Sequence, residues 1–288
     1  MRLTIPAKAV PYLQVAPLAV VFLIFLVVPM MMVLFVSFFD FNMTGLVPIV
    51  TLGNYIDLLT SRSTFALYWQ TLKFALIVWA ITLVLGFTVA YFLAFHVRNT
   101  LVAIGLLLLC TVPFWTSNII RMISWIPLLG KYGVLNRTLL AIGIVDEPVE
   151  WLLFSDFAVV VAYVHLFTLF MIVPIFNSMA RIDRSLIEAA ADAGAGRFRV
   201  MTEVVIPLCK TGIALGSIFV ITLVMGDFFV VKIMSGGRSA SVVMGVFEDV
   251  NLLFYPSAAA SAVVLLIIVT LIVSFILRLV DVRKELTG

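Results

Sequence analysis

Long apolar runs separated by short polar segments dominate this sequence. Residues 15–36 and 74–95, for example, contain no charged side chain. A helix needs roughly 20 apolar residues to cross the hydrocarbon core of a bilayer. Strands of a membrane barrel would be shorter and would alternate between apolar and polar positions. The pattern predicts an all-α membrane protein with six spans, at about 12–38, 70–95, 100–122, 157–179, 211–233 and 256–280.

Composition supports a lipid environment for most of the chain. Of its residues, 64% are hydrophobic and 11% are charged, whereas soluble domains have about 45–50% and about 25%. We therefore expect a single membrane domain over residues 1–288. The first run is too long for a signal-peptide core and no A-x-A site follows it, so we expect it to remain as a span.

Charge and cysteine content exclude several classes of function. The net charge of +3 is too small to suggest a nucleic-acid partner. Cys110 and Cys209 have no metal-ligand spacing. No carboxylate pair or nucleophile–base set is visible, so we expect neither catalytic residues nor a metal on this chain.

The distribution of basic residues predicts the orientation in the membrane. Six spans place both termini on one side, and 11 of the 18 lysines and arginines would then lie on that side. Because cytoplasmic segments are enriched in Lys and Arg, both termini are expected in the cytoplasm. The segment between spans four and five, at about 181–208, is therefore expected to face the cytoplasm.

That cytoplasmic segment contains the most informative pattern. Ser185 followed by Glu188 is the sequence of a capping box. Gly194 suits a helix C-terminus, and the pattern predicts a helix of about two turns. A second helical stretch over 197–205 is expected to end at Pro207. Small alanines allow the first helix to fit closely into a groove on another protein. The alternative is a helix lying on lipid headgroups, but Ala189–Ala191 offers little apolar area for that.

These residues resemble a known family motif. Glu188-Ala189-Ala190, then Gly194, then Ile206-Pro207-Leu208 resembles the EAA loop of ABC importer permeases, in the arrangement of the polyamine-type branch. Arg121-x-x-x-Trp125, Gly133-Val-Leu-Asn136 and Gly226-x-Phe228 are also similar to spermidine/putrescine-type permeases. Lys210-Thr211-Gly212, where relatives usually have Pro-Gly, and Val231-Lys232 depart from that pattern.

The resemblance implies a type I importer permease fold in which a short coupling helix docks on an ATPase subunit. It further implies two copies of that ATPase, a second and different permease, a periplasmic solute-binding protein, and a location in a bacterial inner membrane. ATP and Mg²⁺ would bind the ATPase, because this chain has no G-x-x-x-x-G-K-[ST] loop. No enzyme activity and no cofactor are therefore expected here. The residues implied in ATPase coupling are Ser185, Glu188, Ala189, Ala190, Asp192, Gly194 and Pro207.

Polar groups within or near the spans are candidates for a solute pathway. Ionisable residues in a membrane usually face a cavity or a partner, and aromatic rings can hold cations. The candidates are Trp115, Asn118, Arg121, Trp125, Tyr163, Asp227 and Lys232. The alternatives are internal ion pairs, interfacial anchors and, for His165, a hydrogen bond between helices.

The expected function is ATP-driven import of a small organic solute. A polyamine or another amine-bearing solute comes first, and a different organic or anionic solute second. An ion-coupled secondary transporter is a rival, but it would normally show inverted repeats. A membrane scaffold or sensor, the other rival, would need no EAA pattern.

Overall fold

The computed structural model of the chain describes residues 10–42, 45–97 and 99–280. Five basic residues used in predicting the orientation lie outside them: Arg2, Lys8, Arg98, Arg283 and Lys284. The described chain divides by its internal contacts into two units. The first comprises the described residues up to Thr64 together with 246–266, and the second comprises the described residues of 65–245 and 267–280.

The first unit begins with one long apolar helix. It is built from α1 (Val10–Phe22), a π-helical turn (Leu23–Val27) and α2 (Val28–Val36). An antiparallel hairpin that the sequence did not predict follows, with strands β1 (Phe39–Asn42) and β2 (Gly45–Val50), and then α3 (Gly53–Thr60). Side chains hold α3 to the chain before the hairpin. The hydroxyls of Ser37 and Tyr55 lie 2.6 Å apart, and Asn54 donates to the carbonyls of Ser37 and Phe39.

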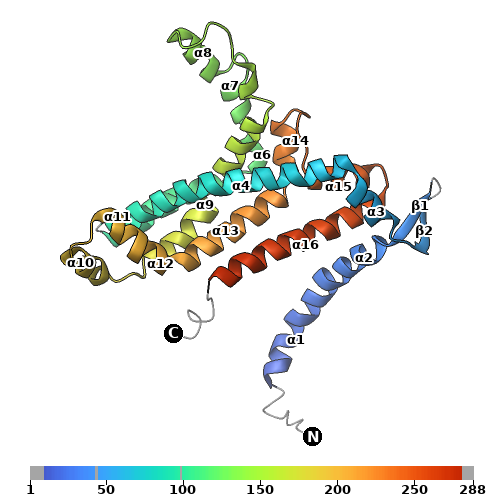
Figure 1. Cartoon of the computed structure of the whole chain (residues 1–288), viewed down its shortest axis with the longest axis horizontal. Coiled ribbons are helices and arrows are strands. Elements are labelled where there is room, and N and C mark those ends of the chain that lie inside the picture. Colours follow the sequence, from blue (N-terminus) through green and yellow to red (C-terminus); the bar gives the residue numbers. More distant parts are fainter. Residues whose placement is uncertain (1–9, 43–44, 98, 281–288) are drawn as a thin grey trace. The chain divides into compact units, whose positions relative to one another are not determined.

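Three helices lie side by side in the second unit (Figure 1): α4 (Arg62–Tyr91), α9 (Asp156–Met179) and α13 (Lys210–Met225). Small residues let them approach closely, as is usual between membrane helices. A Cβ atom added at Gly86 of α4 would meet Met171 Cγ at 2.7 Å, and one at Gly216 of α13 would meet Met171 Sδ at 2.7 Å. Trp79 of α4 also donates from Nε1 to Ser217 Oγ of α13 at 2.8 Å.

The third predicted span, 100–122, is bent and is not one continuous helix. α5 (Thr100–Thr111) ends in a 3₁₀ turn (Val112–Trp115), and a new helix, α6 (Asn118–Ile123), starts after a bend of 91°. Pro113 explains the end of α5, because proline has no N–H and its ring clashes with the preceding turn. Ser117 restarts the helix by accepting a hydrogen bond from Ile119 N at 3.3 Å.

A compact lobe follows α6. Two short helices, α7 (Trp125–Leu129) and α8 (Val134–Ala141), lead into a 3₁₀ turn (Glu150–Leu152). The fully buried Asn136 holds the lobe together. Its amide nitrogen donates to the carbonyls of Gly130 and Val149, and its amide oxygen accepts from Val149 N at 2.8 Å.

The fifth predicted span is also interrupted. α13 ends at Met225, and α14 (Phe229–Met234) begins after a break at residues 226–228. The last helices are α15 (Val242–Asn251) and α16 (Tyr255–Leu279), which belongs to the first unit up to Leu266. The described residues contain four helices long and apolar enough to cross a membrane, and up to six spans if each bent pair counts as one. The predicted all-α membrane fold is confirmed.

The segment between α9 and α13 is helical as predicted, with two differences. α10 (Arg184–Asp192) is capped by Asp183 and not by Ser185, because the Asp183 carboxylate reaches Ser185 N at 3.0 Å. Pro207 does not end the second stretch either. α11 (Arg197–Val200) continues through a π-helical turn (Met201–Val205) into α12 (Ile206–Leu208). The wider π turn gives the proline ring room that an α-helix would not.

Candidate functional site

The α10 helix has capping hydrogen bonds at both ends. At its N-terminus Asp183 Oδ1 accepts from Ser185 N, and this hydrogen bond holds the pKa of the Asp183 carboxyl below its usual value. At its C-terminus Gly194 has φ +85°, Ala195 N donates to Ala190 O and Gly194 N donates to Ala191 O. This is a Schellman motif. The local sequence therefore fixes a short helix with defined ends.

The candidate coupling residues lie on the outside of this chain. Ser185, Glu188, Ala189 and Asp192 of α10 are exposed, and Ala190 is half-buried. Gly194 and Pro207 are exposed as well. α10 thus presents a small, alanine-lined face edged by carboxylates.

Two larger apolar side chains extend this face, and the sequence reasoning did not single them out. Leu186 is 48% exposed and Phe198, in α11, is 75% exposed. An aromatic ring between Arg197 and Arg199 in a polar loop was the available signal. Exposed aromatic residues are common anchors in protein–protein interfaces. The face therefore has the mixed composition of a docking surface.

Arg184, at the start of α10, contacts the end of another helix. Its guanidinium donates to Ala94 O at 3.4 Å, and Ala94 lies in the π-helical turn Phe92–His96 that follows α4. A cavity of about 230 Å³ lies beside this contact. α10 is thus linked to α4 as well as to its neighbours in sequence, α9 and α13.

At the other end of α13, Asp227 meets Tyr163. The buried Tyr163 hydroxyl of α9 donates to Asp227 Oδ1 at 3.2 Å, and the same oxygen accepts from Val230 N at 2.8 Å. Asp227 therefore caps α14 and orients the tyrosine. The structure brings these two candidate pathway residues together.

Arg121 and Asn118 form a second pair. Arg121 is only 7% exposed. Its guanidinium donates to Asn118 Oδ1 and lies 5.0 Å from the ring centre of Phe114. Arg121 Nε and Nη1 have no hydrogen-bond partner among the described residues. A buried donor left without a partner costs about 1–3 kcal/mol, so these two N–H groups suit an acceptor from outside the described residues.

The remaining candidates are Trp125, Trp115 and Lys232. Trp125 donates from Nε1 to His165 Nδ1 at 3.0 Å, so His165 makes the interhelical hydrogen bond that was one of its predicted roles. Trp115 is 88% exposed. Lys232 lies in the last turn of α14 and is also exposed.

A row of aromatic rings connects the two polar pairs, and the sequence reasoning missed it. Tyr163, Phe167 and Phe170 lie on one face of α9, with Tyr163 stacked on Phe167 at 5.6 Å and Phe167 6.3 Å from Phe170. Phe170 then contacts Phe114 at 5.0 Å and Phe219 at 6.2 Å. The signal was the spacing of four and three residues along α9, which places side chains on one helix face. We call these five rings the aromatic row.

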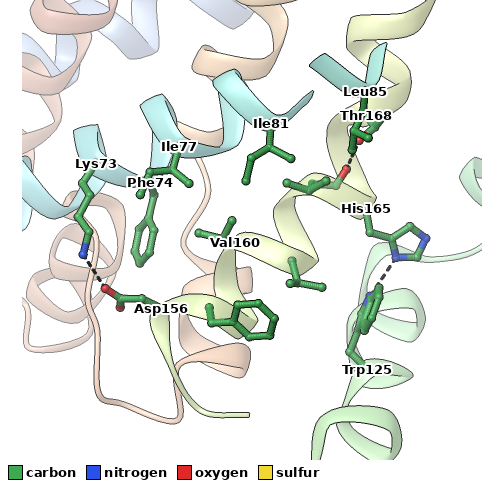
Figure 2. A pocket seen from close by; sticks show the side chains of 13 residues that line it. Lys73, Phe74, Ile77, Ile81, Leu85, Trp125, Asp156, Val160, His165 and Thr168 are labelled. Atoms are coloured by element: carbon green, nitrogen blue, oxygen red, sulfur yellow. Dashed lines mark hydrogen bonds and ion pairs between the residues drawn. The ribbon is translucent and has the colours of Figure 1, made fainter. Parts of the chain in front are cut away.

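A separate apolar groove of about 720 Å³ lies between α4 and α9. Figure 2 shows aliphatic side chains such as Ile77 and Val160 between the Lys73–Asp156 pair at one end and the Trp125–His165 contact at the other. Neither Asp227 nor Tyr163 lines it. The groove is therefore distinct from the Asp227–Tyr163 pair.

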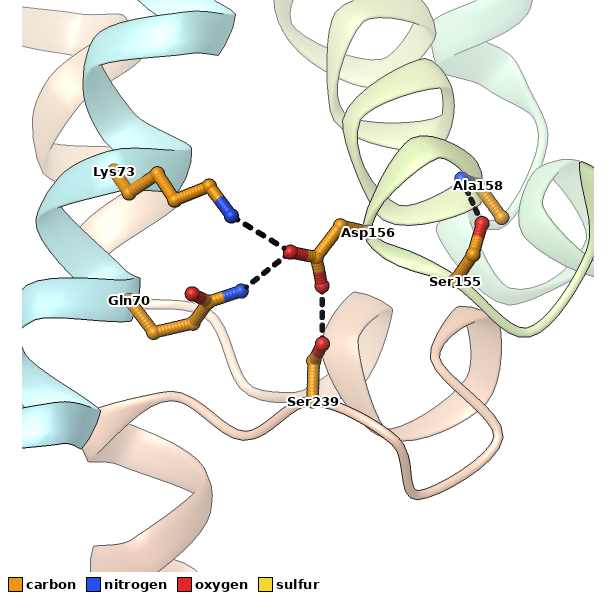
Figure 3. A network of polar contacts seen from close by, with 6 residues as sticks. All are labelled: Gln70, Lys73, Ser155, Asp156, Ala158 and Ser239. Carbon is orange, nitrogen blue, oxygen red and sulfur yellow. Dashed lines mark hydrogen bonds and ion pairs between the residues drawn. The ribbon is translucent and has the colours of Figure 1, made fainter. Parts of the chain in front are cut away.

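Asp156, the first residue of α9, joins three parts of the second unit (Figure 3). Its Oδ2 accepts from Lys73 Nζ at 2.9 Å and Gln70 Nε2 at 2.8 Å, both on α4, and its Oδ1 accepts from the Ser239 hydroxyl. Ser239 lies in the loop between α14 and α15. No group of three or more potential metal ligands occurs among the described residues.

Comparison with known proteins identifies the family. The profile of the binding-protein-dependent transport system inner membrane component matches residues 83–285. The chain belongs to this family. The permease is 34% identical over 243 residues to the spermidine/putrescine transport system permease protein PotB of Escherichia coli (strain K12), covering 82% of this chain and 86% of that protein. It is 26% identical over 258 residues to the trehalose/maltose transport system permease protein MalF of Thermococcus litoralis, covering 86% of each.

The fold of the permease is that of solved importers. A chain of a bacterial alginate ABC transporter, crystallised in complex with an alginate pentasaccharide-bound periplasmic protein, superposes with a TM-score of 0.73 at 17% identity. The match covers 93% of this chain and 92% of that one. At this identity the likeness establishes the type I permease fold, as the EAA resemblance predicted.

Proposed function

We propose that this permease carries a polyamine, or a similar amine-bearing solute, into the cytoplasm by alternating access. The main support is the Asp227 carboxylate at the head of the aromatic row. Carboxylates attract ammonium groups, and aromatic faces stabilise cations by about 0.5–2 kcal/mol each. The 34% identity with PotB, in an alignment that covers 82% of the chain, supports the same solute class. Arg121, Asn118, Trp115, Trp125, Tyr163 and Lys232 complete the proposed pathway set.

The energy for transport is proposed to come from two copies of a separate ATPase that binds ATP and Mg²⁺. Ser185, Glu188, Ala189, Ala190, Asp192, Gly194 and Pro207 are the proposed contact residues on this chain, with Phe198 added. The ATPase can shift the permease between its two conformations only if, in a given nucleotide state, it binds one conformation more tightly than the other. α10 supports such a role because Arg184 contacts the π-helical turn after α4, and because α10 lies between α9 and α13 in the sequence.

The remaining partners follow from the family. We propose a second, different permease and a periplasmic solute-binding protein. We also propose that both termini and α10 face the cytoplasm, as the distribution of basic residues favours. A cysteine introduced at Asp192 is then labelled only from the cytoplasmic side, and one at the exposed Gly143 only from the outside.

Uptake by the assembled importer tests the proposal. Proteoliposomes containing both permeases and the ATPase, with ATP inside and binding protein outside, should accumulate labelled spermidine. Accumulation should cease without ATP. Uptake of a sugar or an anion with no spermidine uptake would refute the solute class, and spermidine uptake without ATP would refute the energy source.

A different organic or anionic solute is the second candidate. Arg121 supports it, because two of its buried N–H groups have no partner among the described residues. The similarity to MalF, at 26% identity, shows that this architecture also resembles permeases for uncharged solutes. Competition between spermidine and such solutes in the same uptake assay separates the two candidates.

A further inference from the structure

A polar groove lies at the end of α9 that is farthest from α10. It has a volume of about 470 Å³ and lies among Leu67 and Gln70 of α4, Phe154 and Ser155 before α9, and Arg238 and Ser239 of the loop after α14. We call it the Arg238 groove. α9 has 24 residues, so its ends are about 36 Å apart at 1.5 Å per residue. If α10 faces the ATPase, the groove opens on the outer side.

The uncompensated charge in this groove is positive. Asp156 is already hydrogen bonded to Lys73, Gln70 and Ser239. Glu150, a carboxylate on which Arg238 acts electrostatically, is already bound by Lys131 at 2.5 Å. Arg238 is exposed, and among the described residues no carboxylate forms a salt bridge with it. The groove therefore suits an acidic side chain from outside this chain.

The loop that carries Arg238 is firmly attached to the helices. Ser239 binds Asp156 at the start of α9, and Val242 N donates to Thr71 Oγ1 of α4 at 2.9 Å. Ser235 Oγ donates to Ser239 O at 3.0 Å within the loop. A Cβ atom added at Gly236 would lie 2.7 Å from the Phe154 ring. A contact made at Arg238 is thus made on a well-fixed surface.

The same loop reaches Asp227 directly. Ser241 Oγ donates to Asp227 O at 3.4 Å. The short helix α14, capped by Asp227 through Val230 N, runs from Asp227 into the loop. A partner bound at Arg238 therefore acts on a segment that shares hydrogen bonds with the proposed solute site.

We propose that an acidic side chain of the solute-binding protein docks in the Arg238 groove, and that the 235–241 loop links this docking to Asp227. The inference rests on the proposed function, since it names the surface that receives the binding protein. Complementary surface charges mainly speed association and are screened by salt. The effect should therefore appear in the binding-protein concentration that the importer requires.

The test measures ATP hydrolysis by the complete importer in nanodiscs against the concentration of spermidine-loaded binding protein. At low salt, Arg238→Ala should raise the half-maximal concentration about threefold. Arg238→Glu should raise it about tenfold, and Arg238→Lys should restore most of the wild-type value. Assembly and basal hydrolysis should not change. Arg137→Glu, at an exposed position of α8, is the matched control and should behave as wild type. High salt should reduce all differences.

Two results would overturn the inference alone. One is a wild-type importer stimulated by binding protein, with Arg238→Glu responding at the same concentration. The other is an altered ATP hydrolysis rate of Arg238→Glu that depends on the anionic lipid content of the nanodisc and not on the binding-protein concentration. That result would assign the groove to lipid headgroups. A wild-type importer that never responds to binding protein would instead contradict the proposed function, and this inference with it.

Discussion

Tyr163 lies in α9 and Asp227 in the break between α13 and α14, 64 residues apart in sequence, yet the tyrosine hydroxyl donates to the aspartate carboxylate at 3.2 Å. Asp227 also accepts from Val230 N. One oxygen thus joins α9, the break after α13 and the start of α14. A solute ammonium that binds this carboxylate would act on all three segments.

Substitutions at this pair should separate solute recognition from the helix cap. Asp227→Asn keeps an acceptor for Val230 N but removes the charge, so we expect at least a tenfold rise in the solute concentration for half-maximal uptake. Tyr163→Phe keeps the ring stacking and loses one hydrogen bond, typically worth about 0.5–1.5 kcal/mol, so a smaller effect is expected. Uptake kinetics and permease content of the membrane are the measurements. Unchanged kinetics in Asp227→Asn would assign Asp227 a purely structural role.

Hydropathy predicted the membrane helices well because span length is set by bilayer thickness. It did not predict the break at residues 116–117, since a bent segment can be as apolar as a straight one. Asp183 and Ser185 are both common N-cap types, and only the backbone geometry shows that Asp183 is the cap. The Asp156 contacts were not predictable, because they join residues 83 to 86 positions apart.

The candidate pathway residues also show that contacts between distant parts of the sequence were not predictable. Asp227 was visible as a lone acid in an apolar segment, but its partner Tyr163 was chosen independently of it. Phe167 and Phe170 were overlooked since phenylalanine is common throughout the spans. A single sequence shows which residues share a helix face, but not which faces meet.

The end of α10 offers a paired test of coupling. Gly194 has φ +85° and open space around its Cβ position, whereas Gly196 has φ −66° with the same open space. A side chain in the left-handed region costs about 1–2 kcal/mol. Gly194→Val should therefore distort the end of α10 and lower ATP-driven uptake severalfold, and Gly196→Val should have little effect. Similar losses in both variants would point to side-chain bulk and not to backbone conformation.

Charge reversal on α10 should impair contact with the ATPase. Glu188→Lys places a cation at an exposed position of the docking face. Like charges that face each other across an interface cost energy. We expect loss of uptake and a weaker pull-down of the ATPase, with normal membrane insertion. Glu147→Lys is the control, since Glu147 is exposed near the opposite end of the second unit. Wild-type uptake by Glu188→Lys would refute the docking role of this residue.

The contact of Gly216 with Met171 predicts a stability effect within the membrane. A side chain at Gly216 would meet Met171 Sδ at 2.7 Å and Met171 Cα at 3.2 Å, so α13 would have to move away from α9. Overpacking of this kind typically costs about 1–3 kcal/mol. Gly216→Leu should lower the thermal midpoint of the purified permease by several degrees. Gly105→Leu, on α5 with nothing within 4 Å of its Cβ position, should leave the midpoint unchanged. Equal midpoints for the two variants would show that α9 and α13 are not closely packed at Gly216.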